Sequence, residues 1–595
     1  MLAKNRLFAI ITAFVLITFC FYCKNDKTDA SVNIKKNFDQ ELIRLQSIVD
    51  QKLFTAVQKG DQGQIKSAFL DARRQYKTIE YYIEYYFPST AVMLNGAPVD
   101  EIELGENLVE NPTGFQVMEA IIYGDELAAQ KDDLLNEVKK MQLNLKRVAR
   151  FNEQYQITDA QLFDAIRLEM FRITGLGITG FDTPDALQSL PEAASALEGI
   201  GYVLSNYGDM EQDKEVKAAI TYLNEHLNYD KFDRLTFITE YLDPLSKRIA
   251  EVRNKLKIPA TASGSALHDD AVTLFQPNAF NPDRFVGNAT EFISDDKIAL
   301  GKTLFSDAIL SNNGDRSCMT CHNPVLAFTD GLTKGAAIGK NKTLLRNTPT
   351  LTYAGLQRAF FYDLKAGSLE DQALDVVHHR DEMNGSLELA SKRINTDKRY
   401  RSLFKKAYKD SIGKADAWKI QHALAAYIRS LTLFNSRLDQ YMRGDRGKLN
   451  NEEKLGFNLF MGKAKCGACH FAPVFNGTAP ALFNKSEAEV LGVPATSDTL
   501  NATLDADLGR YALSPYPQYK HAFKIPTLRN ISKTAPYMHN GVFRTLEEVV
   551  EFYNRGGGIG LGIDVANQTL SPDPLKLTKA EMKAIVAFLK TLDDQ

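Results

Sequence analysis

The sequence is poor in the residues that usually cross-link a protein or give it a strong charge. Its 595 residues include six cysteines and one tryptophan, and the formal net charge is -3. Such a balance provides no strong positive field, so we expect no nucleic-acid partner. Two of the cysteines lie within the first 23 residues, and the other four fall in two short motifs. No cysteine therefore remains for a structural disulfide.

Long apolar runs are also scarce, and the one that stands out lies at the N-terminus. Residues 7–22 are apolar and follow two basic residues, which is typical of an export signal. The run is too short for a confident membrane span. It ends at Cys23, which resembles a lipid-attachment site, with Cys20 as a rival. We expect residues 1–23 to be a lipoprotein-type signal peptide and the mature protein to be periplasmic and membrane-anchored. A simple cleaved signal and an uncleaved anchor are the alternatives.

Long alternating patterns typical of strands are missing as well, so we expect a mainly α fold. Residues 31–256 are rich in Glu, Lys, Leu and Ala, and their apolar residues recur at helical spacing, which predicts an all-helical domain. Residues 257–283 carry Pro, Ala, Ser and Gly and predict a linker. Two further segments follow, over residues 284–434 and 435–595.

Each of these two segments contains one C-x-x-C-H motif in a similar setting. The first reads LGKTLFSDAILSNNGDRSCMTCHNP and the second reads LGFNLFMGKAKCGACHFAP. Both place L-G-x-x-L-F before the cysteines and a proline soon after the histidine. This is a weak internal repeat of one unit.

The C-x-x-C-H pattern predicts covalent haem. Two thiols three residues apart lie on one side of a short turn and can bond the two vinyl groups of a porphyrin, while the adjacent histidine is the proximal iron ligand. A redox dithiol would not require the histidine, and a zinc site would need further ligands nearby. We therefore expect two c-type haems, one in each segment. The two sets are Cys318, Cys321 and His322, and Cys466, Cys469 and His470.

Several ordered segments around the motifs go beyond a generic cytochrome. After the first motif come CHNPVLAFTDGL, RNTPTLTYAG and FFYDLKAGSLEDQALDVVHHRDEM, and after the second come DLGRY and FKIPTLRNISKTAPYMHNGVFRTLEEVVEFYNRGG. This order resembles the bacterial di-haem cytochrome c peroxidase/MauG superfamily over about residues 281–595. The resemblance implies that the first haem is the peroxidatic site. The second haem would collect electrons or stabilise high-valent iron by sharing charge.

The resemblance also implies two catalytic residues above the first haem. Gln372 and Glu382 fall where the family has its distal glutamine and glutamate. A carboxylate above an open iron can move a proton from one peroxide oxygen to the other, assisted by a neutral hydrogen-bonding side chain. Ser368 and Asp371 form a capping pattern that places Gln372 in the first turn of a helix. The alternative is that both residues are solvated surface residues.

Two departures from the family concern the first haem and the path between the two haems. Many relatives carry a removable distal histidine in an I-G-H context, whereas this chain reads AAIGKNK, with Lys340 and no histidine. We therefore expect a five-coordinate first haem that needs no reductive activation. His378 and His379 are alternative ligands, although hydrogen-bonded loop histidines are commoner. Tyr362 replaces the family's tryptophan relay between the haems, and the single tryptophan, Trp418, lies elsewhere.

The distal ligand of the second haem is expected to be Tyr553, with Met538 of PYMHNG as the rival. The peroxidases have their axial methionine at the position of Tyr553, and MauG has a tyrosine there. Thr545 and Glu548 form a capping box, and glycines at 556–558 end the helix, so Tyr553 faces inward in its last turn. A plain core tyrosine is the alternative. A phenolate would lower the haem potential and a thioether would raise it.

The helical N-terminal domain carries one further pattern, NPTGFQVMEAIIYGD. It is similar to the G-x-H-x-x-E signature of imelysin-like proteins, which are helical periplasmic domains linked to iron uptake. Here Gln116 replaces the histidine and Glu119 keeps the carboxylate. Without the histidine a metal site is doubtful, and a helical scaffold or docking module is the preferred interpretation.

These features favour an enzyme that reduces hydrogen peroxide with electrons from a small cytochrome c or cupredoxin. A MauG-like oxidase acting on a partner protein is an alternative, and a non-enzymatic electron-transfer or iron-handling protein is another. The family resemblance also implies a calcium ion between the haem domains, near Asn347 and Thr527, through oxygen ligands. Assembly into a homodimer is a further expectation.

Overall fold

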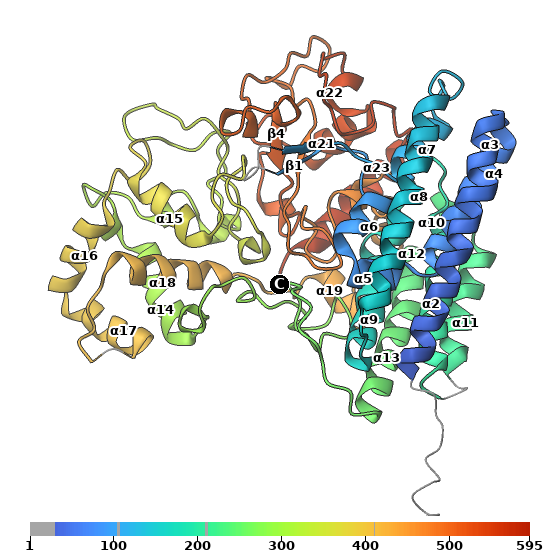
Figure 1. Ribbon diagram of the computed structural model, residues 1–595. Helices are drawn as coiled ribbons and strands as arrows, with labels where there is room; N and C mark the ends of the chain where they lie inside the picture. Colours follow the sequence, from blue (N-terminus) through green and yellow to red (C-terminus); the bar gives the residue numbers. More distant parts are fainter. Residues whose placement is uncertain (1–29, 104–107, 209–211, 410) are drawn as a thin grey trace, which may run out of the picture.

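The computed structural model describes residues 30–103, 108–208, 212–409 and 411–595, and it is mainly helical as expected. The export signal expected over residues 1–23 lies outside these ranges. Within them, no helix has both the length and the apolar character that crossing a membrane requires. Figure 1 shows a helical bundle and two smaller segments that contain the C-x-x-C-H motifs.

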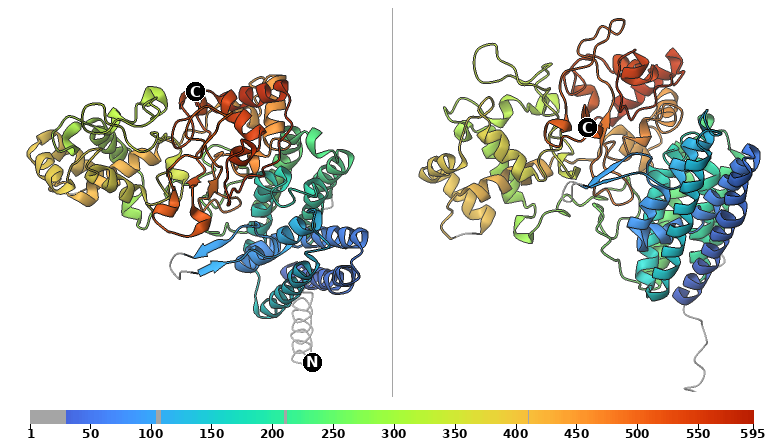
Figure 2. Two further views of the ribbon diagram at one scale, coloured as in Figure 1. Left: turned by 90° about the horizontal axis from the view of Figure 1, so that it is seen from above. Right: turned by 45° about the horizontal axis from the view of Figure 1, so that its top comes forward.

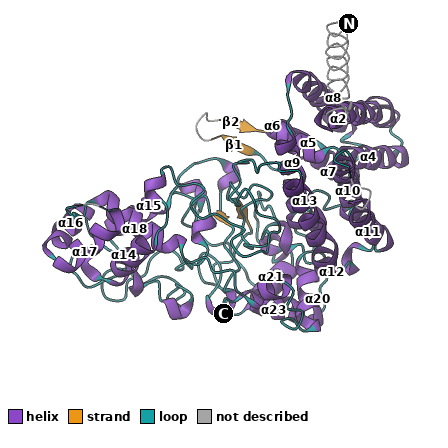
Figure 3. Cartoon of the chain, turned by 90° about the horizontal axis from the view of Figure 1, so that it is seen from below, coloured by secondary structure: helices purple, strands orange, loops and turns teal. Residues whose placement is uncertain are grey.

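The N-terminal part is a bundle whose helices pack through apolar side chains at steps of three and four residues. In α4, for example, Phe69, Ala72 and Tyr76 are all fully buried, as an amphipathic helix requires. An antiparallel hairpin of β1 (Glu101–Glu103) and β2 (Leu108–Glu110) projects from the bundle (Figure 3). The helices are α2 (Ala30–Ser47), α3 (Phe54–Lys59), α4 (Gln62–Lys77), α5 (Glu80–Tyr86), α6 (Pro88–Asn95), α7 (Phe115–Tyr123), α8 (Lys131–Gln154), α9 (Asp159–Gly175), α10 (Ser189–Ser205), α11 (Gln212–Glu225), α12 (Arg234–Phe237) and α13 (Asp243–Lys255).

The two haem segments contain fewer helices and long loops. The first has α14 (Asp295–Ser306), α15 (Leu369–His378), α16 (Leu387–Thr396), α17 (Lys398–Tyr408) and α18 (Ala417–Arg429). The second has α19 (Arg437–Met442), α20 (Asn451–Phe460), α21 (Leu546–Asn554), α22 (Gly557–Gly560) and α23 (Lys579–Leu589). It also contains the short antiparallel pair β3 (Ala488–Val490) and β4 (Ala522–Lys524).

The repeated L-G-x-x-L-F pattern marks the same helix crossing in both segments. The first helix of each repeat packs on a later helix, α14 on α18 and α20 on α23, with the glycine at the contact. A Cβ atom on Gly301 would lie 1.9 Å from the carbonyl oxygen of Ala423, and one on Gly456 would lie 2.0 Å from that of Ala584. Because glycine has no Cβ, it permits this close approach. The internal repeat therefore has a packing cause.

The order of the three parts in space differs from their order in the sequence. The second haem segment, orange to red, lies between the helical bundle and the first haem segment (Figures 1 and 2). One continuous apolar core joins the bundle to the second segment and includes Tyr353, Leu356 and Phe434 of the first segment, whose other buried apolar residues form a second core. At the shared boundary the Phe181 and Phe471 rings are 5.8 Å apart, and Gly175 lies against Pro480. The bundle therefore supports the second haem segment directly.

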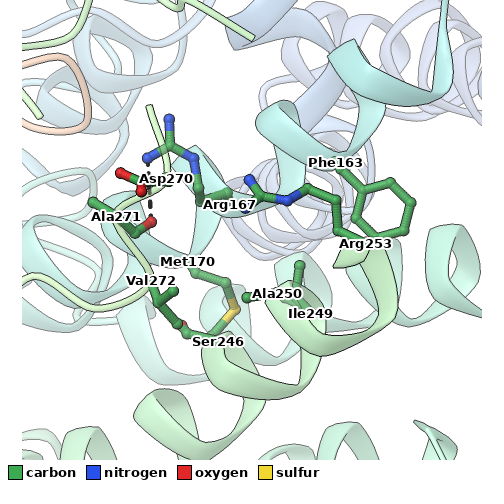
Figure 4. A pocket seen from close by; sticks show the side chains of 10 residues that line it. All are labelled: Phe163, Arg167, Met170, Ser246, Ile249, Ala250, Arg253, Asp270, Ala271 and Val272. Atoms are coloured by element: carbon green, nitrogen blue, oxygen red, sulfur yellow. Dashed lines mark hydrogen bonds between the residues drawn. The ribbon is translucent and has the colours of Figure 1, made fainter. Parts of the chain in front are cut away.

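The segment that we expected to be a linker, residues 257–283, packs against the bundle and the second haem segment. The backbone N–H of Ala266 donates to the carbonyl of Leu482 at 2.7 Å. On the bundle side, the guanidinium of Arg167 in α9 donates to the carbonyl of Ala271 at 3.4 Å (Figure 4). Its Pro-, Ser- and Gly-rich composition indicates the lack of regular secondary structure and carries no information about packing.

Candidate haem sites

The two C-x-x-C-H motifs form the same local structure. Each begins with a single 3-10 turn, Cys318–Thr320 in the first motif and Cys466–Ala468 in the second. In both, the histidine N–H donates to the carbonyl of the first cysteine at 2.9 Å. The four cysteines of the motifs are free thiols. The sequence repeat is thus a structural repeat that presents two thiols and one imidazole.

Both histidines are oriented by a backbone carbonyl. The Nδ1 atom of His322 lies 2.9 Å from the carbonyl oxygen of Phe328, and that of His470 lies 3.2 Å from the carbonyl oxygen of Phe475. An Nδ1–H donor of this kind leaves the Nε2 lone pair available for iron. Burial lowers the pKa of His322, and it lowers the pKa of His470 to about 4, which favours the neutral form that binds metal.

The first motif opens onto a hollow in the surface of the first segment. Cys318, Cys321 and His322 line it together with apolar side chains, and Gln372 and Glu382 are among its few other polar residues. The apolar lining includes Phe305, Leu351, Val376, Leu424 and Ile428. Two thiols, an oriented imidazole and an apolar wall fit a covalently attached haem.

Gln372 reaches the hollow because α15 begins where the sequence indicated. The Ser368 hydroxyl accepts the N–H of Asp371 at 3.0 Å, which caps the helix and places Gln372 in its first turn. The Asp371 carboxylate accepts from the Ser368 hydroxyl at 2.7 Å and forms no reciprocal bond to the Ser368 backbone. The structure therefore contains half of the capping box that we expected, and this half is sufficient to begin the helix.

Glu382 follows α15 in a tight turn and faces the same hollow. Burial raises the pKa of its carboxyl group, and the positive charges of His379, Lys365 and Arg316 oppose this effect. The Nδ1 atom of His379 lies 3.3 Å from Oε1 of Glu382. Neither His378 nor His379 lines the hollow, where His322 is the one histidine.

Arg316 holds the loop in which many relatives carry a removable ligand, and our sequence analysis did not identify it. Its guanidinium donates to the carbonyls of Ala336 at 3.0 Å and Ala337 at 2.9 Å, and to that of Glu382 at 3.4 Å. Lys340, farther along this loop, is exposed and does not line the hollow. The one available signal was the position of Arg316, two residues before the first motif.

The helix that carries Tyr553 forms as predicted. The Thr545 hydroxyl and the Glu548 carboxylate make a reciprocal capping box at the start of α21. The helix ends at Asn554, and Gly556 follows with a φ of 90°, a left-handed value that favours glycine. Tyr553 therefore lies in the last turn, packed on the core of the second segment.

Tyr553 is close to the second motif. Burial raises the pKa of its phenol, and charge on Cys469, Cys466 and Glu489 would raise it further. Met538 is half-buried against the same core, with a left-handed φ of 71°. The structure thus brings Tyr553 to the two cysteines, and its role as a ligand stays a prediction.

Tyr362 lies at the contact between the two haem segments. Its carbonyl accepts the N–H of Lys524 at 2.7 Å, and its hydroxyl donates to Oδ1 of Asn347 at 3.4 Å. Burial raises the pKa of this phenol, so it stays protonated. Nearby, Arg346 bridges the segments through Asp507 at 2.7 Å and Asp363 at 2.6 Å. Tyr362 is therefore held in a rigid, charged interface.

The two residues expected near a calcium ion differ in their positions. Asn347 is at the interface, where its backbone N–H donates to the carbonyl of His539 at 2.8 Å and its side-chain amide donates to that of Leu332 at 2.8 Å. Thr527 is buried within the second segment, and its hydroxyl donates to the carbonyl of Val474 at 2.8 Å. Through these bonds Asn347 contacts both segments, whereas Thr527 contacts the second segment alone.

The imelysin-like signature residues in the bundle bind the backbone. The Gln116 amide donates to the carbonyl of Asn95 at 2.8 Å. Oε1 of the fully buried Glu119 accepts the N–H groups of Asp185 and Ala186, both at 2.9 Å. In the part of the chain that the structure describes, no group of three or more His, Cys, Asp and Glu residues is arranged to hold a metal ion.

Comparisons with known proteins agree with this site. The family model of the di-haem cytochrome c peroxidase matches residues 295–447. Cytochrome-c peroxidase IdrP2 of Denitromonas iodatirespirans is 33% identical over 330 residues, which make up 53% of this chain and 84% of that protein. The methylamine utilization protein MauG of Methylorubrum extorquens is 32% identical over 335 residues, covering 56% of this chain and 88% of that protein.

A solved structure of a MauG-like protein associated with microbial copper homeostasis is 29% identical, with a TM-score of 0.45, and covers 52% of this chain and 92% of that one. The sequence relatives are matched over most of their own length, and the family model covers the first C-x-x-C-H motif. The chain therefore belongs to the di-haem cytochrome c peroxidase/MauG family and carries two c-type haems.

Proposed function

We propose that the protein reduces hydrogen peroxide to water at the first haem, using electrons that a small cytochrome c or cupredoxin delivers through the second haem. The observation that carries this proposal is the hollow beside the first motif. It brings Gln372 and Glu382 together with His322 and both thiols. A polar pair facing an otherwise apolar cofactor hollow suits proton transfer to a bound substrate.

The haem, when bound, supplies the iron that binds peroxide and the electrons that break its O–O bond. His322 would hold this iron through Nε2, because its Nδ1 is engaged by the carbonyl oxygen of Phe328. The Glu382 carboxylate would take a proton from one oxygen of the peroxide and return it to the other, which leaves as water. Gln372 orients the peroxide by hydrogen bonding, and the apolar wall excludes bulk water.

A MauG-like oxidation of a partner protein is the second candidate, and Tyr553 beside the second motif favours it. Against it, the Tyr362 hydroxyl donates to the amide oxygen of Asn347. An amide does not take up a proton at neutral pH, so this contact offers no base for oxidation of the phenol. The peroxidase proposal does not require Tyr362 to lose its proton.

We also propose Tyr553 as the distal ligand of the second haem, and a calcium ion held near Asn347 by backbone carbonyl oxygens. The helical bundle would act as a scaffold for the second haem segment, supported by their common apolar core. Iron handling is less favoured because the Glu119 carboxylate is engaged by two backbone amides. A periplasmic, lipid-anchored location and a homodimer complete the proposal.

The test is peroxide consumption by the purified holoprotein with reduced cytochrome c or a reduced cupredoxin. Oxidation of two donor molecules per peroxide, without prior reductive activation, is the expected result. Absence of donor oxidation even after partial reduction of the protein would overturn the peroxidase proposal. Modification of a partner protein under the same conditions would instead support the MauG-like alternative.

A further inference from the structure

The backbone after α15 is folded so that one histidine side chain meets Glu382. The N–H of His379 donates to the carbonyl of Asp375 at 2.9 Å and ends the helix. The carbonyl of His379 accepts the N–H of Glu382 at 3.0 Å and that of Asn384 at 2.9 Å. These bonds fix the two residues three positions apart on one turn.

The two side chains bridge the hollow and the solvent. Nδ1 of His379 lies 3.3 Å from Oε1 of Glu382. The His379 side chain is 44% exposed and that of Glu382 is 27% exposed. Glu382 lines the haem hollow and His379 does not. The pair therefore connects the interior of the site with bulk water through one contact.

The surrounding charges support a histidine that carries protons. His379 directly follows the C-terminus of α15. Asp375, one turn before it, pairs with Lys365 at 3.0 Å, so that carboxylate is partly neutralised. Arg316 donates to the backbone carbonyl of Glu382 at 3.4 Å. Glu382 is thus the acceptor that His379 faces directly.

We propose that His379 is the proton relay that recharges Glu382 from solvent during peroxide reduction. This inference rests on the proposed function. Reduction of one peroxide to two waters consumes two protons and two electrons. The electrons come from the redox partner, and the protons must enter from water. The Nδ1–H of the His379 imidazolium passes to Oε1 of Glu382, and the exposed ring then takes a proton from water.

The first test is the binding of cyanide to the ferric first haem, followed by stopped-flow absorbance. Hydrogen cyanide must lose its proton when it binds, and the Glu382–His379 path run in reverse would carry that proton to solvent, so the rate reports transfer along the relay without any turnover. In H379N the rate should fall by at least ~10-fold, and added imidazole should restore it. H378N is the matched control, since its histidine is the exposed neighbour and does not line the hollow.

The second test is peroxide turnover, with its pH profile and solvent deuterium isotope effect. H379N should lower the peroxide kcat/KM, enlarge the isotope effect and leave the high-spin ferric EPR signal of the first haem unchanged. If H379N binds cyanide and turns over peroxide as wild type does while E382Q is impaired, the relay is wrong and the role of Glu382 survives. If the wild-type protein does not turn over peroxide, the proposed function fails, and the cyanide rates still decide on the relay.

Discussion

The two haem segments share their means of attachment and differ in what faces it. Each presents two thiols and a histidine whose Nδ1 is bound to a backbone carbonyl, beside a glycine-mediated helix crossing. The first opens onto a hollow that contains Gln372 and Glu382, whereas the second has Tyr553 beside its cysteines. Both segments therefore use the same unit for haem attachment. We expect the segment that follows it, which ends in α15 or in α21, to decide whether the site is open or filled.

The segments differ equally in how they are supported. The second shares its apolar core with the helical bundle, and most of the buried apolar residues of the first form a separate core. A fixed environment around the second haem suits electron transfer, since the surroundings of a haem set its potential. The open site is thus on the more independent of the two segments, joined to the second by the Arg346 bridge.

The largest expected effect comes from removing the acid–base group of the open site. E382Q should lower kcat/KM for hydrogen peroxide by at least ~100-fold, because a glutamine cannot accept and return the proton. The absorption spectrum of the second haem should not change. E388Q, which alters an exposed carboxylate in α16, is the control. Equal activity of E382Q and wild type would remove the functional distinction between the two sites.

The helix crossings allow the independence of the two segments to be measured. G456A should destabilise the second segment and the bundle together, by about 1–3 kcal/mol, since the added Cβ overlaps the carbonyl of Ala584. G301A should destabilise the first segment by a similar amount and leave the bundle unchanged. Far-UV circular dichroism and Soret melting curves distinguish the two.

G367A is the control for these crossings, since a Cβ there meets nothing within 4 Å. A single common transition that shifts equally in G301A and G456A would show that the first segment is not independent.

The filled site can be tested by comparing its two candidate ligands. Y553F should change the absorption spectrum of the second haem and raise its reduction potential, because a phenolate ligand would be lost. M538L should leave both unchanged. Spectroelectrochemistry resolves the two haems by their potentials. If M538L changes the spectrum and Y553F does not, the methionine is the ligand and the second site resembles the peroxidases more than MauG.

The smallest expected effect is a shift in pH dependence at the open site. Burial raises the pKa of Glu382, so activity should fall as the pH drops through a value above that of a free carboxyl, where the carboxylate becomes protonated. Lys365 opposes this rise. K365M should move the acidic limb of kcat/KM to higher pH, by less than about one unit because Lys365 is partly exposed. A shift to lower pH would contradict this electrostatic picture.

Local pattern was sufficient for much of the fold and of the site. Helical spacing predicted the bundle, and the cap at Thr545 predicted α21 because each depends on neighbouring residues. Resemblance to a family placed Gln372 and Glu382, and the structure brings both to the first motif. Their catalytic roles, like the ligand role of Tyr553, stay predictions.

Long-range contacts could not be predicted in the same way. The spatial order of the three parts depends on which apolar faces meet. The periodicity of apolar residues shows that a helix has an apolar face, but it does not show which other element covers that face. The Arg346 bridge joins residues 161 positions apart. Arg316 contacts backbone carbonyls of a loop, and His379 meets Glu382 across a turn. Both contacts depend on how the loops are packed in the folded protein. Composition likewise identified residues 257–283 as irregular and could not reveal their packing on the bundle and the second haem segment.

The most direct test of the contrast between an open and a filled site is EPR of the resting ferric holoprotein. We predict one high-spin ferric signal from the first haem, whose hollow contains no second histidine, and one low-spin signal from the second haem. C318A/C321A should remove the high-spin signal and retain the other. Two low-spin signals in the wild-type protein would show that both irons are six-coordinate and would contradict the account.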